Sequence, residues 1–90
     1  MNWPGVAISR VGYTVYFRMN KRAIIRWNFQ QGKVQLYMSG GRGLQSQRRI
    51  NQIAGTFSWP FRVHHEKGEW IVRVPGASRL FENGMVFDVL

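Results

Sequence analysis

The sequence predicts a mainly β domain of the β-rich α+β class, with a small antiparallel sheet or partly open barrel built from two hairpins. Apolar and polar residues alternate with a period of two over several short segments, and glycine-containing turns separate those segments. One segment near residues 46–54 has helical spacing instead. Because the 90 residues contain no repeat, linker or low-complexity tract, we expect residues 1–90 to form a single domain.

The first predicted hairpin joins residues 22–29 to residues 33–38 through Gly32, which is free to take a positive φ. A further strand is expected before it, over residues 13–19. The side chains expected to face the core are Tyr13, Val15, Phe17, Met19, Ala23, Ile25, Trp27, Phe29, Val34, Leu36 and Met38.

The second predicted hairpin has residues 56–64 and 69–74 as its strands and residues 66–68 as its turn. Its expected core residues are Phe57, Trp59, Phe61, Val63, Trp70, Val72 and Val74. Pro60 has no backbone N–H to donate, so its strand is expected at a sheet edge or with a bulge.

The expected helix begins at Ser46, whose hydroxyl suits an N-cap, and ends at Gly55, where a left-handed residue often stops a helix. Its apolar face holds Ile50, Ile53 and Ala54. Residues 77–84 are expected to form one helical turn or a loop, followed by a last strand over residues 85–90.

The net charge of +9 is segregated along the chain. Residues 1–65 contain ten Lys or Arg and no acidic residue, whereas Glu66, Glu69, Glu82 and Asp88 all follow. The chain has ten arginines and three lysines, and the planar guanidinium group binds phosphate or carboxylate in a forked geometry. This pattern indicates an acidic partner; the alternative is a basic but inert surface.

The strand face opposite the predicted core combines cationic with aromatic and aliphatic side chains. They are Arg18, Arg22, Arg26, Arg62, Arg73, Tyr16, Ile24, Tyr37 and Ile71. Single-stranded nucleic acid binds surfaces of this kind, because arginines follow the phosphates and aromatic rings stack on bases. Alternatively, the helix or a second subunit covers Ile24 and Ile71, and a homodimer with a basic groove would satisfy both interpretations.

The glycine-rich segment around residues 39–43 leads into the helix and brings Arg42, Arg48 and Arg49 near its start, which favours an anion site. The alternative is a simple connection between two hairpins. The residues predicted to bind nucleic acid are Arg18, Arg22, Arg26, Arg42, Arg48 and Arg49 for phosphates and Tyr16 and Tyr37 for stacking.

Catalytic, cofactor and membrane signals are scarce. There is no cysteine, and four carboxylates leave little scope for acid–base chemistry or a metal site; His64 and His65 adjoin a predicted turn and are expected at an exposed rim. Neither phosphate-binding glycine fingerprint is present. We therefore expect no enzyme, no metal and no cofactor, and an intracellular, cytoplasmic protein without a membrane partner.

Three functions remain open. The first is a nucleic-acid-binding module. The second is a small interaction or inhibitor protein, of the kind a virus or mobile element encodes, whose basic face docks on an acidic or nucleic-acid-binding surface of a larger complex. The third is an oligomeric structural subunit. Charge segregation favours the first two, and they are not separated by sequence because phosphates and carboxylates attract the same arginines.

Overall fold

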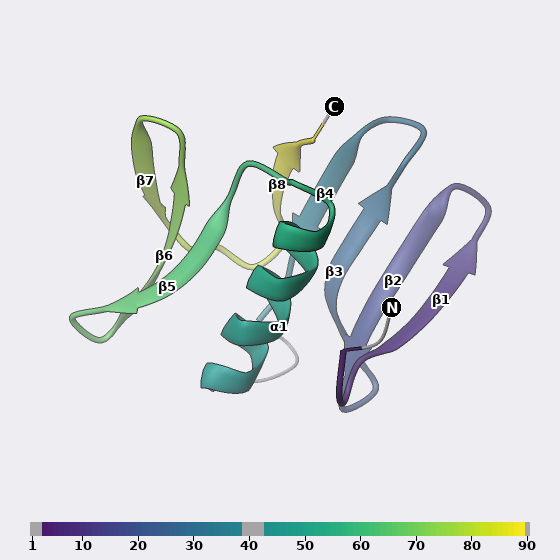
Figure 1. Ribbon diagram of the computed structural model, residues 1–90, viewed down its shortest axis with the longest axis horizontal. Coiled ribbons are helices and arrows are strands. Elements are labelled where there is room, and N and C mark those ends of the chain that lie inside the picture. Colours follow the sequence, from purple (N-terminus) through teal and green to yellow (C-terminus); the bar gives the residue numbers. More distant parts are fainter. Residues whose placement is uncertain (1–2, 39–42, 90) are drawn as a thin grey trace.

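The computed structural model describes residues 3–38 and 43–89, which form two antiparallel sheets and one helix (Figure 1). In chain order the elements are β1 (Ala7–Val11), β2 (Thr14–Met19), β3 (Arg22–Asn28), β4 (Lys33–Leu36), α1 (Leu44–Thr56), β5 (Arg62–Glu66), β6 (Glu69–Val74), β7 (Ala77–Leu80) and β8 (Met85–Asp88). The sheets have the strand orders β1-β2-β3-β4-β8 and β5-β6-β7. The predicted β-rich α+β class is confirmed, with open sheets and not a closed barrel.

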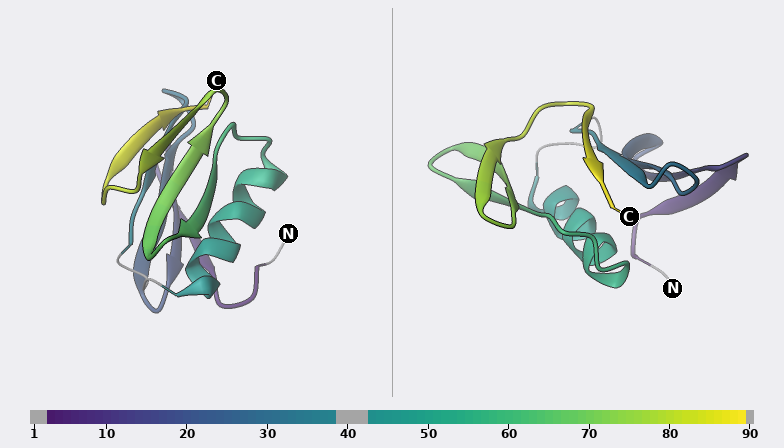
Figure 2. Two further views of the ribbon diagram at one scale, coloured as in Figure 1. Left: turned by 90° about the vertical axis from the view of Figure 1, so that its left-hand side faces the viewer. Right: turned by 90° about the horizontal axis from the view of Figure 1, so that it is seen from above.

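Helix α1 lies against one face of the five-stranded sheet, and the three-stranded sheet stands beside them (Figure 2). The helix contributes Ile50, Ile53 and Ala54 to the core. The buried residues of the strands and connections are Trp3, Phe17, Met19, Ile24, Ile25, Val34, Leu36, Trp59, Phe61, Val63, Trp70, Val72, Met85 and Phe87. The core therefore lies between the helix and both sheets, and it includes most of the side chains that the alternation predicts.

A β-bulge interrupts the pairing of β2 with β3. Phe17 pairs with Ile25 but Arg18 pairs with Ala23, so Ile24 is an extra residue on β3. Ile24 and Ile25 are both 0% exposed. The prediction that Ile24 lies on the arginine-bearing face is therefore wrong, and Ala23 shares the face of Arg18 and not that of the core.

Both predicted ends of the helix need correction, although residues 46–54 are helical as expected. Gly43 is the N-cap, and Ser46 lies buried within the helix. Gly55 is also helical; the left-handed residue is Ser58, with φ of 56°. The Ser58 N–H donates to Gly55 O at 3.2 Å and the Trp59 N–H donates to Ala54 O at 2.8 Å, the two bonds of a Schellman motif.

Several strand boundaries also differ from those predicted. Residues 77–80 form strand β7 and not a helical turn or loop, because a turn at Pro75 and Gly76 returns the chain antiparallel to β6. Strand β5 begins only at Arg62, after Pro60, and it is an edge strand as expected. Tyr13 is 54% exposed in the turn between β1 and β2, so its assignment to the core is wrong.

Candidate nucleic-acid interface

The face of the five-stranded sheet turned away from α1 is not covered by any other part of the described chain (Figure 2). We call it the outer face. Arg18 lies on it opposite Ala7 and Ala23, and cross-strand pairing places two further rows of side chains there, since residues opposite each other in antiparallel strands point the same way. One row is Ser9, Tyr16, Arg26, Gln35 and Val86, and the other is Val11, Thr14, Asn28, Lys33 and Asp88.

Two arginines of the outer face share one aromatic ring. The guanidinium carbon of Arg18 lies 4.6 Å from the centre of the Tyr16 ring, and that of Arg26 lies 5.7 Å from it. Arg18 also donates a hydrogen bond to the Ser9 hydroxyl. These contacts hold two positive charges close together, because the electron-rich ring face attracts each cation.

Carboxylates neutralise other cations of the protein. In the described residues, the ion pairs between arginine or lysine and a carboxylate join Lys33 to Asp88 and Arg73 to Glu66. Arg18 and Arg26 belong to none of these pairs. Their guanidinium groups therefore retain donors for an external anion.

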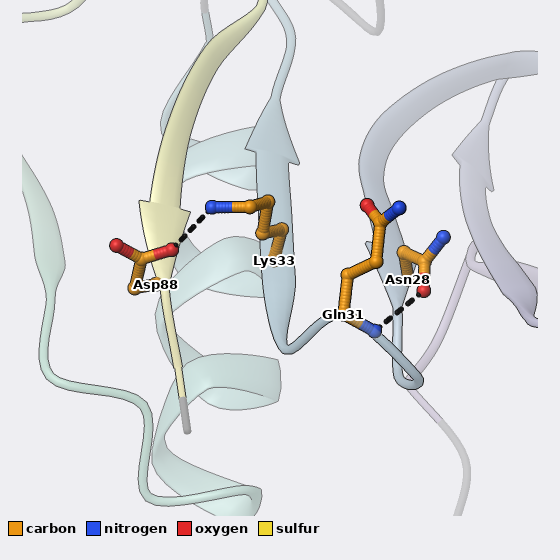
Figure 3. Close-up of polar contacts among 4 residues, drawn as sticks. All are labelled: Asn28, Gln31, Lys33 and Asp88. Carbon is orange, nitrogen blue, oxygen red and sulfur yellow. Dashed lines mark hydrogen bonds and ion pairs between the residues drawn. The ribbon is translucent and has the colours of Figure 1, made fainter.

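A hollow of about 260 Å³ lies beside the cluster of Tyr16, Arg18 and Arg26, and Arg26 also lines the hollow. Its lining residues are Thr14, Arg26, Asn28, Gln31, Lys33, Gln35 and Val86. Figure 3 shows Asn28 and Gln31 on one side of Lys33 and Asp88 on the other, with the Gln31 N–H donating to Asn28 Oδ1 at 2.9 Å. The Lys33 Nζ lies 2.7 Å from Asp88 Oδ1. Because this ion pair is exposed, it only partly offsets the positive charge of Lys33.

Tyr37 extends the outer face beyond the hollow. Its hydroxyl donates to Gln35 Oε1 at 3.1 Å, and Gln35 Nε2 donates to Gly84 O at 3.3 Å. The amide of Gln35 is thus fixed between β4 and the segment before β8. Tyr16, Arg18, Arg26 and Tyr37, all predicted from the sequence, therefore occur on one face of one sheet.

Three other predicted binding residues lie elsewhere. By its pairing with buried Met19, Arg22 at the start of β3 is directed to the α1 side of the sheet. Arg48 is exposed on α1, and Arg49 on the same helix donates to Pro4 O at 2.6 Å. Arg42 lies outside the described residues.

The predicted arginine-bearing face also included three residues of β5 and β6, which belong instead to the three-stranded sheet. They are Arg62, Arg73 and Ile71. Arg62 and Arg73 are opposite each other there, and Arg62 donates to Trp59 O and Phe61 O at 2.9 and 2.6 Å. Ile71 lies half-buried on β6. The single arginine face expected from alternation is therefore divided between two sheets.

Sequence reasoning did not select the polar lining of the hollow. On the two strands that Gly32 connects, core residues alternate with Asn28, Lys33 and Gln35. This alternation in the sequence could have indicated that these three polar residues share the outer face. Thr14 joins them only through the pairing of β2 with β3.

Comparisons with protein-family models, curated proteins and solved structures found no match to this chain. Within the described ranges, no helix is long and apolar enough to cross a membrane. The same ranges contain no cluster of three or more His, Cys, Asp or Glu side chains suited to a metal ion. A proposal about function therefore depends on the chemistry of the outer face.

Proposed function

We propose that the protein binds nucleic acid through the outer face of its five-stranded sheet. The observation that carries this proposal is the pair of guanidinium groups held on Tyr16 beside a hollow with a polar lining. Arginines without a carboxylate partner bind phosphate oxygens, and the amides of the hollow suit the donors and acceptors of a base or sugar.

A single strand fits this surface better than a duplex does. Five strands about 4.8 Å apart give a sheet about 19 Å wide, across which an extended strand can lie with its phosphates on the arginines. Unpaired bases can also turn their edges toward the hollow, whereas a duplex keeps those edges in its grooves. Because Arg18 and Arg26 occupy the Tyr16 ring, a base would stack on a guanidinium plane or on Tyr37.

The test compares two double variants that remove equal charge. In Arg18→Gln/Arg26→Gln the outer face loses two cations; in Arg22→Gln/Arg48→Gln two exposed arginines elsewhere are replaced. Binding of fluorescent single-stranded DNA, single-stranded RNA and duplex is measured by anisotropy over a range of salt concentrations. For a single strand, each arginine–phosphate interaction contributes about 0.7 to the slope of log affinity against log salt, so the outer-face variant should reduce that slope by about 1.4. The control variant should retain most of the wild-type slope and affinity.

Equal losses in both variants would mean that net charge and not the outer face governs binding. Failure of the wild type to bind any nucleic acid at about 50 mM salt would reject the proposal. In that case the same basic face is better explained by an acidic surface on a protein partner, as in an interaction or inhibitor protein.

A further inference from the structure

Strand β1 is an open edge of the five-stranded sheet. It is the first strand in the sheet order, pairs with β2 alone among the described strands, and has all five residues exposed. Figure 1 shows it at the right-hand rim, where no other described segment lies beside its outer edge. Such an edge presents backbone N–H and C=O groups that can pair with another strand.

The free backbone groups of β1 can be identified from the pairing. The Phe29 N–H donates to Tyr13 O at 3.1 Å, which fixes the alternation of β2: Tyr13, Val15 and Phe17 bond to β3, and the residues between them bond to β1. The β1 partners of Thr14 and Tyr16 are Val11 and Ser9. It follows that Ile8 and Arg10 turn their backbone groups outward.

Strand β5, in contrast, has part of its edge occupied, at Val63. The Asn51 side chain on α1 donates from Nδ2 to Val63 O at 2.7 Å and accepts from the Val63 N–H at Oδ1, also at 2.7 Å. At Val63 the helix therefore supplies the bonds that another strand would make. In β1 there is no proline or bulge that would block pairing.

We propose that β1 pairs antiparallel with β1 of a second copy of this chain, about a two-fold axis at Ser9. This register sets Ser9 opposite Ser9 and Ile8 opposite Arg10 of the other copy, so the outward backbone groups of both residues are satisfied on each side. It also covers part of Ile8 and Val11, which are 48% and 69% exposed.

The position of Arg10 permits this close approach. Its Nε donates to Gly12 O at 2.8 Å, and its guanidinium carbon lies 4.8 Å from the centre of the Phe29 ring. Both contacts draw the cation toward the turn after β1 and away from Ser9. The Arg10 charges of two copies are thus held apart on opposite sides of the axis.

The proposed dimer should be weak, because its interface is small and both copies are strongly positive. One pair of five-residue strands buries less than the roughly 1,200–2,000 Å² of a stable interface, and each copy carries a charge of +9. High salt should therefore strengthen association. The pairing also joins two outer faces side by side, with Arg18 of each copy near the axis through its bond to Ser9. This last consequence rests on the proposed function: a single strand that covers both faces would favour the dimer.

Sedimentation without nucleic acid tests the pairing independently of the proposed function. At about 1 M salt, where the Debye length is about 3 Å, the wild type should change from monomer to dimer as its concentration rises to about 1 mM. Ile8→Pro removes an N–H that points away from β2 and makes no hydrogen bond to that strand. This substitution should therefore abolish the dimer. The matched control is Ser78→Pro on β7: the Phe81 N–H donates to Trp70 O, so the Ser78 N–H also faces outward, and this variant should still dimerise.

Amide exchange of the wild type provides a second measurement if a proline variant does not fold. The Ile8 and Arg10 amides should exchange rapidly in dilute protein and at least tenfold more slowly in concentrated protein, whereas the Ser78 amide should stay fast. A monomer at every concentration, a dimer that Ile8→Pro leaves intact, or exchange at Ile8 and Arg10 that does not depend on concentration would each overturn the proposal.

Discussion

The Asn51 side chain should be among the most important polar groups for stability, and its replacement is the sharpest test of how α1 is joined to the three-stranded sheet. Its amide makes two hydrogen bonds of 2.7 Å to the backbone of Val63, one as donor and one as acceptor. Val63 is fully buried, so its backbone groups have little access to water once the amide is removed.

The expected cost of Asn51→Ala follows from these contacts. Two hydrogen bonds contribute about 0.5–1.5 kcal/mol each, and leaving the Val63 N–H and C=O unpaired adds to the loss. Alanine recovers about 0.5 kcal/mol through its higher helix propensity. The net loss of unfolding free energy should be about 2 kcal/mol, equivalent to a fall of roughly 8–16 °C in Tm for a domain of this size.

Urea unfolding followed by circular dichroism measures this loss. Gln45→Ala, an exposed change on the same helix, is the control and should alter stability by less than about 0.5 kcal/mol. Asn51→Asp separates the two bonds, because it keeps an acceptor for the Val63 N–H and sets a second oxygen against Val63 O. If Asn51→Ala costs no more than the control, the amide does not hold the helix to β5 and the reasoning is refuted.

Two further predictions concern the bulge and the acidic turn. Ile24→Thr should lower the free energy of unfolding by about 2–4 kcal/mol, because it places a hydroxyl in the core. It should leave the monomer–dimer equilibrium unchanged. A variant that is as stable as the wild type but associates more weakly would show that Ile24 is exposed and not buried. Glu66 accepts a hydrogen bond from His64 and lies 3.7 Å from Arg73, and these contacts lower its pKa below the ordinary value of 4.5. Stability from this carboxylate is therefore present above pH 4.5 and lost as pH falls through the lowered pKa, by a small amount because the group is exposed. Glu66→Gln should lack this acid-dependent loss, and parallel pH profiles for the two proteins would contradict the assignment.

The strands predicted from the sequence are those with one buried face. Strands β2 and β4 bury alternate residues, and so does β3 after its bulge; burial is what gives a sequence its period of two. The two strands that were not predicted, β1 and β7, are edges on which every residue is exposed. Their extended backbone comes from pairing with β2 and β6, and pairing between neighbours leaves no apolar alternation in the sequence.

The helix was located by Ile50, Ile53 and Ala54, but its ends were not. Serine and glycine are frequent at helix ends, yet Ser46 is buried within the helix and Gly55 is helical, and a Cβ added at Gly55 would only make an ordinary contact of 3.6 Å with Arg62. The end is set instead by the Schellman bonds and by the burial of Trp59 after it. Packing against the rest of the protein therefore overrides the local preference of both residues.

The candidate site was predicted in part because Tyr16, Arg18 and Arg26 lie on regular stretches of two paired strands. Arg22 and Arg26, four residues apart, would share a face in an uninterrupted strand. Because Ile24 is an extra residue, the residues of β3 before it point to the opposite face from the one expected. Arg22 therefore points toward the α1 side, while Arg26 stays beside Tyr16. Two adjacent isoleucines were the available signal, because a regular strand would expose one of them and the bulge buries both. The core thus determines which arginines reach the outer face.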